Sequence, residues 1–148
     1  MKISVKATYG IVAALDLAMQ NGTVPVQAKS IARRQAIPLR FLEQVLHAMK
    51  QAGLIDSARG AQGGYLLGKL PKEISLADIV EALDGSLSST VRHRAAQRRE
   101  GTLSDSLLGG VWERVRQAEL SVLNSVTLQD LTERYRQLDQ ERTLMYHI

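Results

Sequence analysis

The sequence contains no cysteine. Disulfide bonds, zinc fingers, thiol redox switches and cysteine nucleophiles are therefore excluded. Aromatic residues make up only 4% of the chain, so any core must be mostly aliphatic. No apolar run approaches the roughly 20 residues that a membrane-spanning helix needs. The 148 residues, 45% of them hydrophobic, are enough for one globular domain, or for one domain with an appendage.

The N-terminal segment also lacks the marks of a secretory signal. Met1-Lys2-Ile3-Ser4 does not lead into a long apolar stretch with a small-residue cleavage site. Together with the absence of a run long enough to span a membrane, this indicates a soluble cytoplasmic protein without a membrane partner.

The net charge of +4 conceals an asymmetry between the two halves. Residues 1–70 contain nine Lys and Arg against three Asp and Glu, a net +6, whereas residues 71–148 contain ten against twelve, a net −2. Positive charge that could neutralise phosphates therefore lies in the N-terminal half. A solvated basic surface is the plainer explanation, and only the motifs below favour nucleic acid over it.

The clearest pattern begins at Pro38. Apolar residues recur there at i, i+3, i+4 and i+7, which predicts an amphipathic helix. Proline suits the first helical position because its missing N–H has no partner there, and Gly53 suits the left-handed residue that ends a helix. The apolar stripe is Leu42, Val45, Leu46 and Met49, and the opposite face is Arg40, Glu43, Gln44, His47 and Lys50.

A change of period after Gly53 predicts a two-stranded hairpin. Three glycines close to one arginine predict a tip that can approach another backbone. A polar-faced helix followed by a basic, glycine-rich hairpin is what a winged helix uses, with the helix in a major groove and the wing at the phosphates or the minor groove. The strands are Leu54-Ile55 and Tyr65-Leu66-Leu67, and the tip contains Arg59, Gly60, Gly63 and Gly64.

Two helices are expected before this one. Residues 4–20 form the first, capped by Ser4 and stopped by Asn21-Gly22, and residues 27–36 form the second, which makes a helix-turn-helix with the helix from Pro38. The β-prone segment 24–26 could pair with the hairpin as a third strand. The expected inward side chains are Tyr9, Ile11, Val12, Leu15, Ala18, Met19, Ala28, Ile31 and Ala32, with Lys29, Arg33 and Arg34 pointing outward.

The segment after the hairpin leads into a basic loop. Residues 70–73 are expected to be a linker, and Ser75 to cap a short helix that Asp84-Gly85 closes. Residues 86–102 combine four arginines and His93 with few large apolar groups, which predicts a mobile surface loop.

The C-terminal part is expected to hold two further helices. A helix of roughly 20 residues follows from Leu103, and Thr127 caps a last helix before a fraying tail over 139–148. Gly109-Gly110 lies inside the long helix, where each glycine costs about 1 kcal/mol relative to alanine. Either another helix approaches closely there, or the regular helix begins only at Val111. The inward residues of the last helix are expected to be Leu128, Leu131, Tyr135 and Leu138.

A long apolar helix at the end of a small domain has little to pack against, so we expect a homodimer. A two-fold dimer also places two reading helices on the half-sites of a pseudo-palindromic operator. The expected fold is mainly α with a small β-hairpin wing. The expected parts are a winged helix-turn-helix DNA-binding domain over 1–84, a flexible basic loop over 85–102, and a dimerisation helix with a C-terminal helix over 103–148.

Two other functions compete with DNA binding. An enzyme is disfavoured because His47, His93 and His147 form no Ser/His/Asp arrangement and no phosphate-binding loop is present. A winged helix that acts mainly through a protein partner is the stronger alternative, and the basic wing argues against it. A protein partner or a small effector that modulates DNA binding is left open.

In the helix from Pro38, the hairpin and the flanking helices, the sequence resembles the IscR/CymR-type (Rrf) family of winged-helix transcriptional regulators, over roughly residues 1–135. The most specific motif is Phe41-Leu42-Glu43-Gln44 followed by Arg59-Gly60 and the run from Gly63 to Gly68. The resemblance implies a dimeric DNA-binding regulator in which Glu43 and Gln44 face base edges and Arg59 enters the minor groove. Arg40 departs from the family, where a small hydroxyl residue is common. Further matches are Tyr9, Gly53-Leu54, Ile79 to Asp84, Trp112 and Thr127-Leu128.

Many members of this family hold an iron–sulfur cluster through three cysteines before the long helix and a histidine at its start. Here there is no cysteine, and Gly109 stands where the histidine would fall, so a thiolate-held cluster is excluded and no cofactor is expected. His93 is the only metal-capable side chain nearby, and a lone histidine is more often a surface residue than a ligand.

The predicted DNA-binding residues combine both lines of reasoning. The helix supplies side chains that read bases, among them Arg40 and His47, and the wing and neighbouring helices supply contacts to phosphate or the minor groove. No catalytic or metal-binding residue is predicted. The full set is Lys6, Arg33, Pro38, Leu39, Arg40, Glu43, Gln44, His47, Arg59, Gly60 and Gly63.

Overall fold

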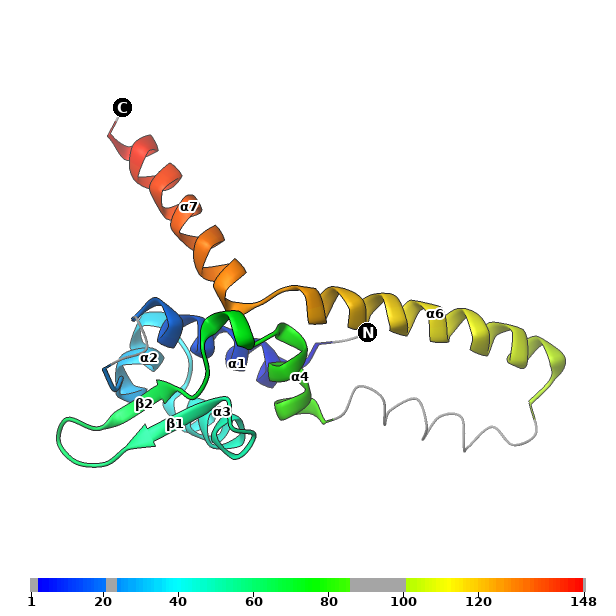
Figure 1. Ribbon diagram of the computed structural model, residues 1–148, viewed down its shortest axis with the longest axis horizontal. Helices are drawn as coiled ribbons and strands as arrows, with labels where there is room; N and C mark the ends of the chain where they lie inside the picture. The colour runs from blue at the N-terminus through cyan, green and yellow to red at the C-terminus, as the bar shows by residue number, and fades with distance from the viewer. Residues whose placement is uncertain (1–2, 21–23, 86–100, 148) are drawn as a thin grey trace.

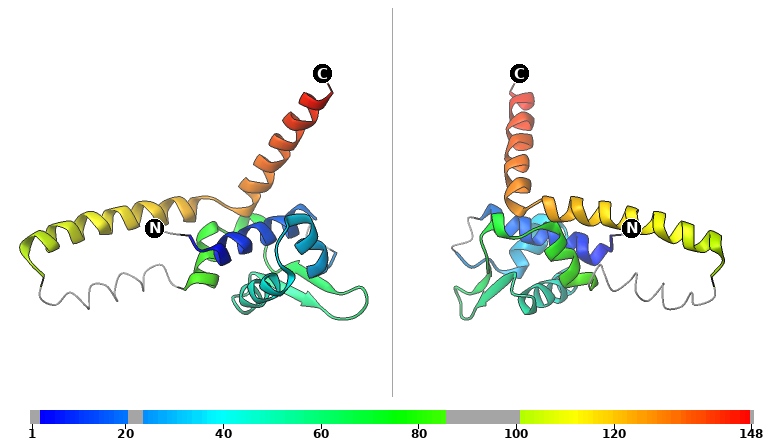
Figure 2. Two further views of the ribbon diagram at one scale, coloured as in Figure 1. Left: turned by 180° about the vertical axis from the view of Figure 1, so that it is seen from behind. Right: turned by 45° about the vertical axis from the view of Figure 1, so that its right-hand side comes forward.

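The computed structural model describes residues 3–20, 24–85 and 101–147 and confirms a mainly α fold with one small hairpin (Figure 1). The elements from α1 to α4 form a winged helix-turn-helix, and two long helices, α6 and α7, extend away from it (Figure 2). The elements are α1 (Val5–Met19), α2 (Ala28–Gln35), α3 (Leu39–Gln51), β1 (Ile55–Ala58), β2 (Gly64–Leu67), the 3-10 helix η1 (Pro71–Glu73), α4 (Leu76–Asp84), α6 (Leu103–Ser125) and α7 (Leu128–Tyr146).

Local sequence sets where the helices begin. The Ser4 side chain caps α1 by accepting the N–H of Ala7 at 2.9 Å, as predicted. Helices α4, α6 and α7 each begin with a capping box, in which a hydroxyl side chain and a carboxylate three residues later satisfy each other's backbone N–H. The pairs are Ser75 with Asp78, Thr102 with Asp105, and Thr127 with Asp130.

The cap at Thr102 decides between the two explanations of the glycine pair. Since α6 begins at Leu103, Gly109 and Gly110 lie within the helix, and a start at Val111 is wrong. The predicted stop at Asn21-Gly22 and most of the predicted basic loop, residues 86–100, lie outside the described residues.

The core is aliphatic, but α1 contributes to it differently from expectation. Its fully buried residues are mostly small, including Ala7, Ala13 and Ala14, whereas Leu15 and Met19 are only half-buried. A Cβ on Gly10 would lie 2.1 Å from Cδ1 of Leu83 in α4. The small residues therefore let α4 pack closely against α1, which a pattern of large apolar residues does not reveal.

The predicted hairpin forms, but β1 begins at Ile55 instead of Leu54, and the pairing extends from Ile55 opposite Leu67 to Ala58 opposite Gly64, which was expected in the tip. Val26 and Tyr65 exchange both backbone hydrogen bonds, at 2.9 and 2.8 Å, so the expected third strand is a single antiparallel bridge. Gly64 permits this close approach because a Cβ there would lie 2.5 Å from the carbonyl carbon of Val26.

Three expectations for the C-terminal half are wrong. Residues 70–73 are not a plain linker but include η1, where the Glu73 carboxylate accepts the Leu70 N–H at 3.2 Å. Helix α7 continues to Tyr146 instead of fraying from residue 139, because its residues are mostly strong helix formers. Tyr135 and Leu138 are 49% and 48% exposed, so they do not point into a core of this chain.

The joint between α6 and α7 is tied to the start of α4. The N–H of Leu76 donates to the Val126 carbonyl, and the N–H of Leu128 donates to the Ile74 carbonyl, both at 2.9 Å. Leu128 itself is fully buried. These hydrogen bonds tie the joint to α4, and α7 packs against α1 and η1 as well.

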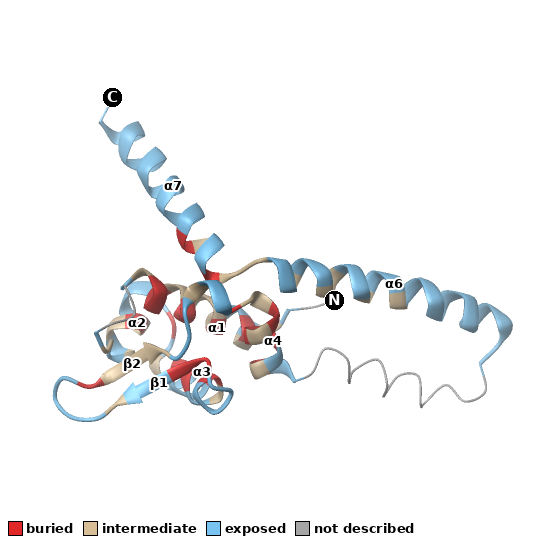
Figure 3. Ribbon diagram, in the orientation of Figure 1, coloured by how far each residue is buried: buried red, intermediate tan, exposed pale blue. Residues whose placement is uncertain are grey.

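Beyond this joint, α6 and α7 are largely exposed (Figure 3). In the part of the chain that the structure describes, no atom beyond the chain neighbours and the nearby helix backbone lies within 4 Å of a Cβ placed on Gly109 or Gly110. Within the described residues, no helix combines the length and hydropathy of a transmembrane segment. The exposed large apolar residues of α6 are Leu103, Leu107, Leu108, Val111, Trp112, Val115 and Val122.

Candidate nucleic-acid interface

Helix α3 separates an apolar face from a polar face, as predicted. The four residues of its apolar stripe are completely buried in the core. The opposite face carries two cations, a carboxylate, an amide and an imidazole, all on exposed residues. Because the large aliphatic side chains of the stripe face inward, this polar face is open to an external partner. The exposed polar residues are Arg40, Glu43, Gln44, His47 and Lys50.

Both ends of α3 are fixed by backbone geometry. Pro38 was predicted to be the first helical residue, but it is the N-cap, one position before the first helical residue Leu39, because its ψ of 126° is not helical. At the other end Gly53 has a φ of +78° and donates to the Lys50 carbonyl at 3.0 Å, while Leu54 donates to the Met49 carbonyl at 3.0 Å. This is a Schellman motif, and it passes the chain directly from α3 into β1.

The tip of the hairpin carries the predicted wing residues. Arg59 and Gly60 are exposed, and Gly60 has a φ of +102°. Gly63 is buried, and a Cβ there would lie 2.3 Å from the carbonyl oxygen of Ala58. Gly63 therefore shapes the turn that presents Arg59, and its own atoms are largely covered.

The elements that carry most of these residues lie together. Helix α3 and the hairpin are on the side of the winged helix that faces away from α7 (Figures 1 and 2). Arg33 is exposed in the last turn of α2. Lys6, in the first turn of α1, and Leu39, at the start of α3, are half-buried.

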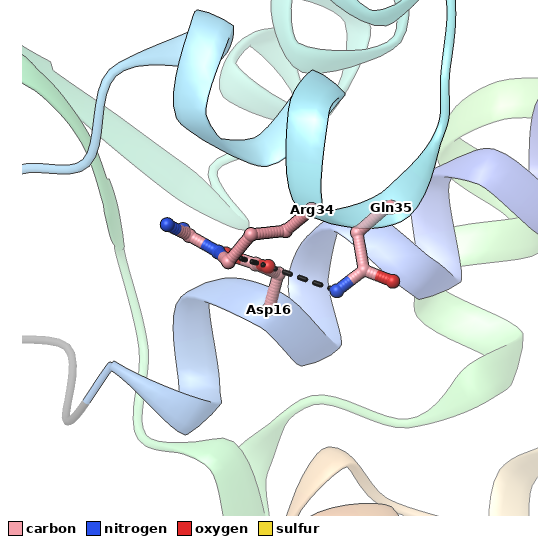
Figure 4. A network of polar contacts seen from close by, with 3 residues as sticks. All are labelled: Asp16, Arg34 and Gln35. Atoms are coloured by element: carbon pink, nitrogen blue, oxygen red, sulfur yellow. Dashed lines mark hydrogen bonds and ion pairs between the residues drawn. The ribbon is translucent and has the colours of Figure 1, made fainter.

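A polar cluster that the sequence patterns did not reveal joins α1 to α2 (Figure 4). Asp16 is 3% exposed on α1 and accepts hydrogen bonds from Nε and Nη2 of Arg34 at 3.0 and 2.7 Å, and from Nε2 of Gln35 at 2.9 Å. The hydrogen bond to Asp16 raises the pKa of Arg34. Arg34 was expected to point outward, but its guanidinium turns back onto α1. The sequence signal that could have revealed this cluster is an aspartate, Asp16, on the otherwise apolar face of α1.

Helix α1 also contacts the start of α3. The rings of Tyr9 and Phe41 meet edge to face, with centroids 5.5 Å apart and an interplanar angle of 83°. Helix α1 thus holds both helices of the helix-turn-helix, α2 through Asp16 and α3 through Tyr9.

Residues 3–134 match the Rrf2 family, which is described as iron-dependent transcriptional regulator. The chain belongs to the Rrf2 family. The predicted resemblance is confirmed, and this Rrf2 protein is a DNA-binding transcriptional regulator with the winged-helix fold. Its relatives are regulators, a class of protein that normally has no enzymatic activity.

Two relatives illustrate how far the similarity extends. The regulator CymR of Bacillus subtilis is 36% identical over 148 residues, covering 99% of each chain. The regulator IscR of Photorhabdus laumondii is 34% identical over 141 residues, covering 94% of this chain and 84% of its own.

Solved structures agree with the fold. The structure of CymR, described as the global cysteine regulator of B. subtilis, superposes with a TM-score of 0.75 at 36% identity, covering 90% of this chain and 97% of its own. T. potens IscR superposes with a TM-score of 0.73 at 37% identity, covering 91% of this chain and 88% of its own.

The residues present do not fit the iron–sulfur cluster known in this family. The chain has no cysteine to supply thiolates. Gly109, at the position expected for the histidine ligand, lies within α6 and has no side chain. In the described part of the chain, no three His, Asp or Glu residues come close enough to form a metal site. A cluster held by protein thiolates therefore has no part in the function proposed below.

Proposed function

We propose that this Rrf2 regulator binds a pseudo-palindromic DNA operator as a homodimer, with α3 in the major groove and the hairpin as a wing. The observation that carries the proposal is the polar face of α3, which is exposed while the opposite stripe is completely buried. A helix of this kind with its two ends fixed presents side chains to base edges in a defined register.

The chemistry of each side chain suggests its role. A Glu43 carboxylate can accept from cytosine N4, and the Gln44 amide can pair with adenine. Arg40 and His47 lie on the same face, about one helical turn before Glu43 and after Gln44 respectively. Arg59 at the wing tip suits the negative potential of a narrow minor groove.

The remaining predicted residues would position the protein on the duplex. Lys6 and Arg33 are assigned to phosphate contacts, which carry affinity but little sequence information. Pro38, Leu39, Gly60 and Gly63 would act through the backbone geometry of the helix start and of the wing.

The homodimer is supported by the apolar face of α6, which the described residues leave exposed. Seven large apolar residues of that helix are exposed, and clustered exposed apolar side chains of this kind are typical of an interaction surface. Among the described residues nothing lies within 4 Å of a Cβ placed on Gly109 or Gly110, so a close approach of the partner protomer would explain this glycine pair. We accordingly assign residues 1–84 to DNA binding, 85–102 to a connecting loop and 103–148 to dimerisation.

The test is binding to a duplex that the wild-type chain selects from a randomised library. We expect affinity to fall steeply between about 50 and 200 mM salt, because phosphate contacts release counterions. Arg59→Ala should weaken binding by about 1–3 kcal/mol, measured by fluorescence anisotropy. Asp56→Ala, which changes an exposed charge on β1, should not weaken binding.

Two outcomes would contradict the proposal. Undiminished binding by Arg59→Ala removes the wing from the mechanism. An affinity that does not change with salt favours a protein partner over DNA as the ligand of this surface.

A further inference from the structure

We propose that the Asp16–Arg34–Gln35 cluster is a positioning device for DNA reading, which fixes the end of α2 on α1 and thereby sets the direction of α3. The inference rests on the proposed role of α3 as the reading helix. It assigns a function in recognition to Asp16, a residue that lies on neither α3 nor the wing.

The hydrogen bonds of the cluster have defined directions. Both carboxylate oxygens of Asp16 are used, Oδ1 by Nη2 of Arg34 and Oδ2 by Nε of Arg34 and by the Gln35 amide. The Asp16 side chain is only 2% exposed, whereas that of Arg34 is 41% exposed. A planar guanidinium held through two nitrogens, together with the amide of the next residue, fixes both the position and the rotation of the last turn of α2.

The turn that follows has little freedom to absorb a displacement. Only Ala36, Ile37 and Pro38 separate α2 from α3. Ala36 has a left-handed backbone conformation, and the Ile37 N–H donates to the Ala32 carbonyl at 3.0 Å. The Ile37 side chain is only 4% exposed, and the ring of Pro38 fixes the φ of that residue. A shift at the end of α2 would therefore be passed on to the first turn of α3, where Arg40 lies.

Stability alone does not explain such a cluster. Replacing a buried ion pair with apolar residues is often neutral or stabilising, whereas removing one partner is costly. An apolar contact between α1 and α2 would hold the helices together but would not fix their rotation. The directional bonds are therefore better explained by the geometry of the reading helix.

The experiment compares two duplexes, the one selected by the wild-type chain and a scrambled duplex of the same composition. Asp16→Asn should lower affinity for the selected duplex about tenfold, comparable to losing one good base contact, while affinity for the scrambled duplex stays within about twofold because phosphate contacts remain. The matched control is Glu113→Gln. Glu113 also accepts from an arginine and a glutamine, but it lies on α6, so both affinities should stay unchanged.

A second variant separates positioning from folding. The double variant Asp16→Leu with Arg34→Leu should restore the thermal midpoint that Asp16→Asn loses, yet keep the reduced affinity for the selected duplex. If this folded double variant binds the selected duplex as the wild type does, the cluster only fills space and the inference is overturned, even if Asp16→Asn fails to fold.

The proposed function is tested separately by Glu43→Ala. If Glu43→Ala loses sequence preference while the Asp16 variants keep it, only the role of the cluster is overturned. Unchanged preference in Glu43→Ala overturns the assignment of α3 as reading helix, and the positioning role with it.

Discussion

At the scale of single residues, Ala36 is the one described non-glycine residue with a positive φ, at 53°. A left-handed conformation costs an alanine about 1–2 kcal/mol, and glycine avoids this at a somewhat larger entropic loss on folding. Ala36→Gly should therefore raise the free energy of unfolding by about 0.5–1 kcal/mol, measured by urea denaturation. Ala118→Gly, within α6, should lower it by a similar amount. Lower stability of Ala36→Gly would show that the turn is not strained.

Glu43 is the residue whose substitution should change sequence preference most clearly. Without the carboxylate, Glu43→Ala loses an acceptor for cytosine but no phosphate contact, so preference should change more than overall affinity. Repeating the library selection with the variant measures this directly. Lys50→Ala, at the end of the same face, should reduce affinity for all sequences alike. An equal loss on every duplex by Glu43→Ala would contradict a base-reading role.

The sequence predicted the exposed residues of α3 and missed the cluster at Asp16 for related reasons. A helical stripe such as Leu42 to Met49 is a local pattern, so its polar complement follows from spacing alone. The Asp16–Arg34 contact joins residues 18 positions apart on two helices. Pattern analysis treats both as charged surface residues, and only their packing shows that they meet.

At the scale of elements, the wing depends on the close contact of β2 with Val26. Gly64→Ala would place a Cβ 2.5 Å from the Val26 backbone at a φ of +147°, so the bridge between Val26 and Tyr65 should open. The expected loss is about 1–3 kcal/mol of stability, together with weaker DNA binding. Ser57→Ala on the exposed part of β1 should stay within about 0.5 kcal/mol of the wild type. An unaffected Gly64→Ala would show that the wing is held in another way.

Element starts were easier to predict than element ends. Capping residues such as Ser75 and Thr127 are local signals, and the structure confirms both. The end of α7 was missed because residues 139–143 are all polar, and this run interrupts the apolar period on which prediction depends. The buried face of α1 was missed because it consists of small residues, which make close packing without a strong hydrophobic pattern.

At the scale of the whole molecule, the exposed face of α6 should govern self-association. Trp112 is 59% exposed in the isolated chain, so Trp112→Glu should leave the protomer folded by circular dichroism. In the proposed dimer the same substitution places a charge in an apolar interface, and sedimentation velocity should then detect monomers. DNA affinity should fall in parallel, because one protomer covers one half-site.

The control is Arg114→Gln, which makes the same change in net charge on an exposed residue of α6. It should preserve the dimer. A Trp112→Glu variant that still sediments as a dimer would remove α6 from the proposed interface.

The two hydrogen bonds between Ile74–Leu76 and Val126–Leu128 have a mechanical consequence. Helix α6 has 23 residues, which gives a lever of about 34 Å. A tilt of about 10° at this joint would move the far end of the lever by about 6 Å. The separation of the two DNA-contacting surfaces in a dimer, and hence the spacing of half-sites that it tolerates, would then depend on the geometry of a joint far from the duplex.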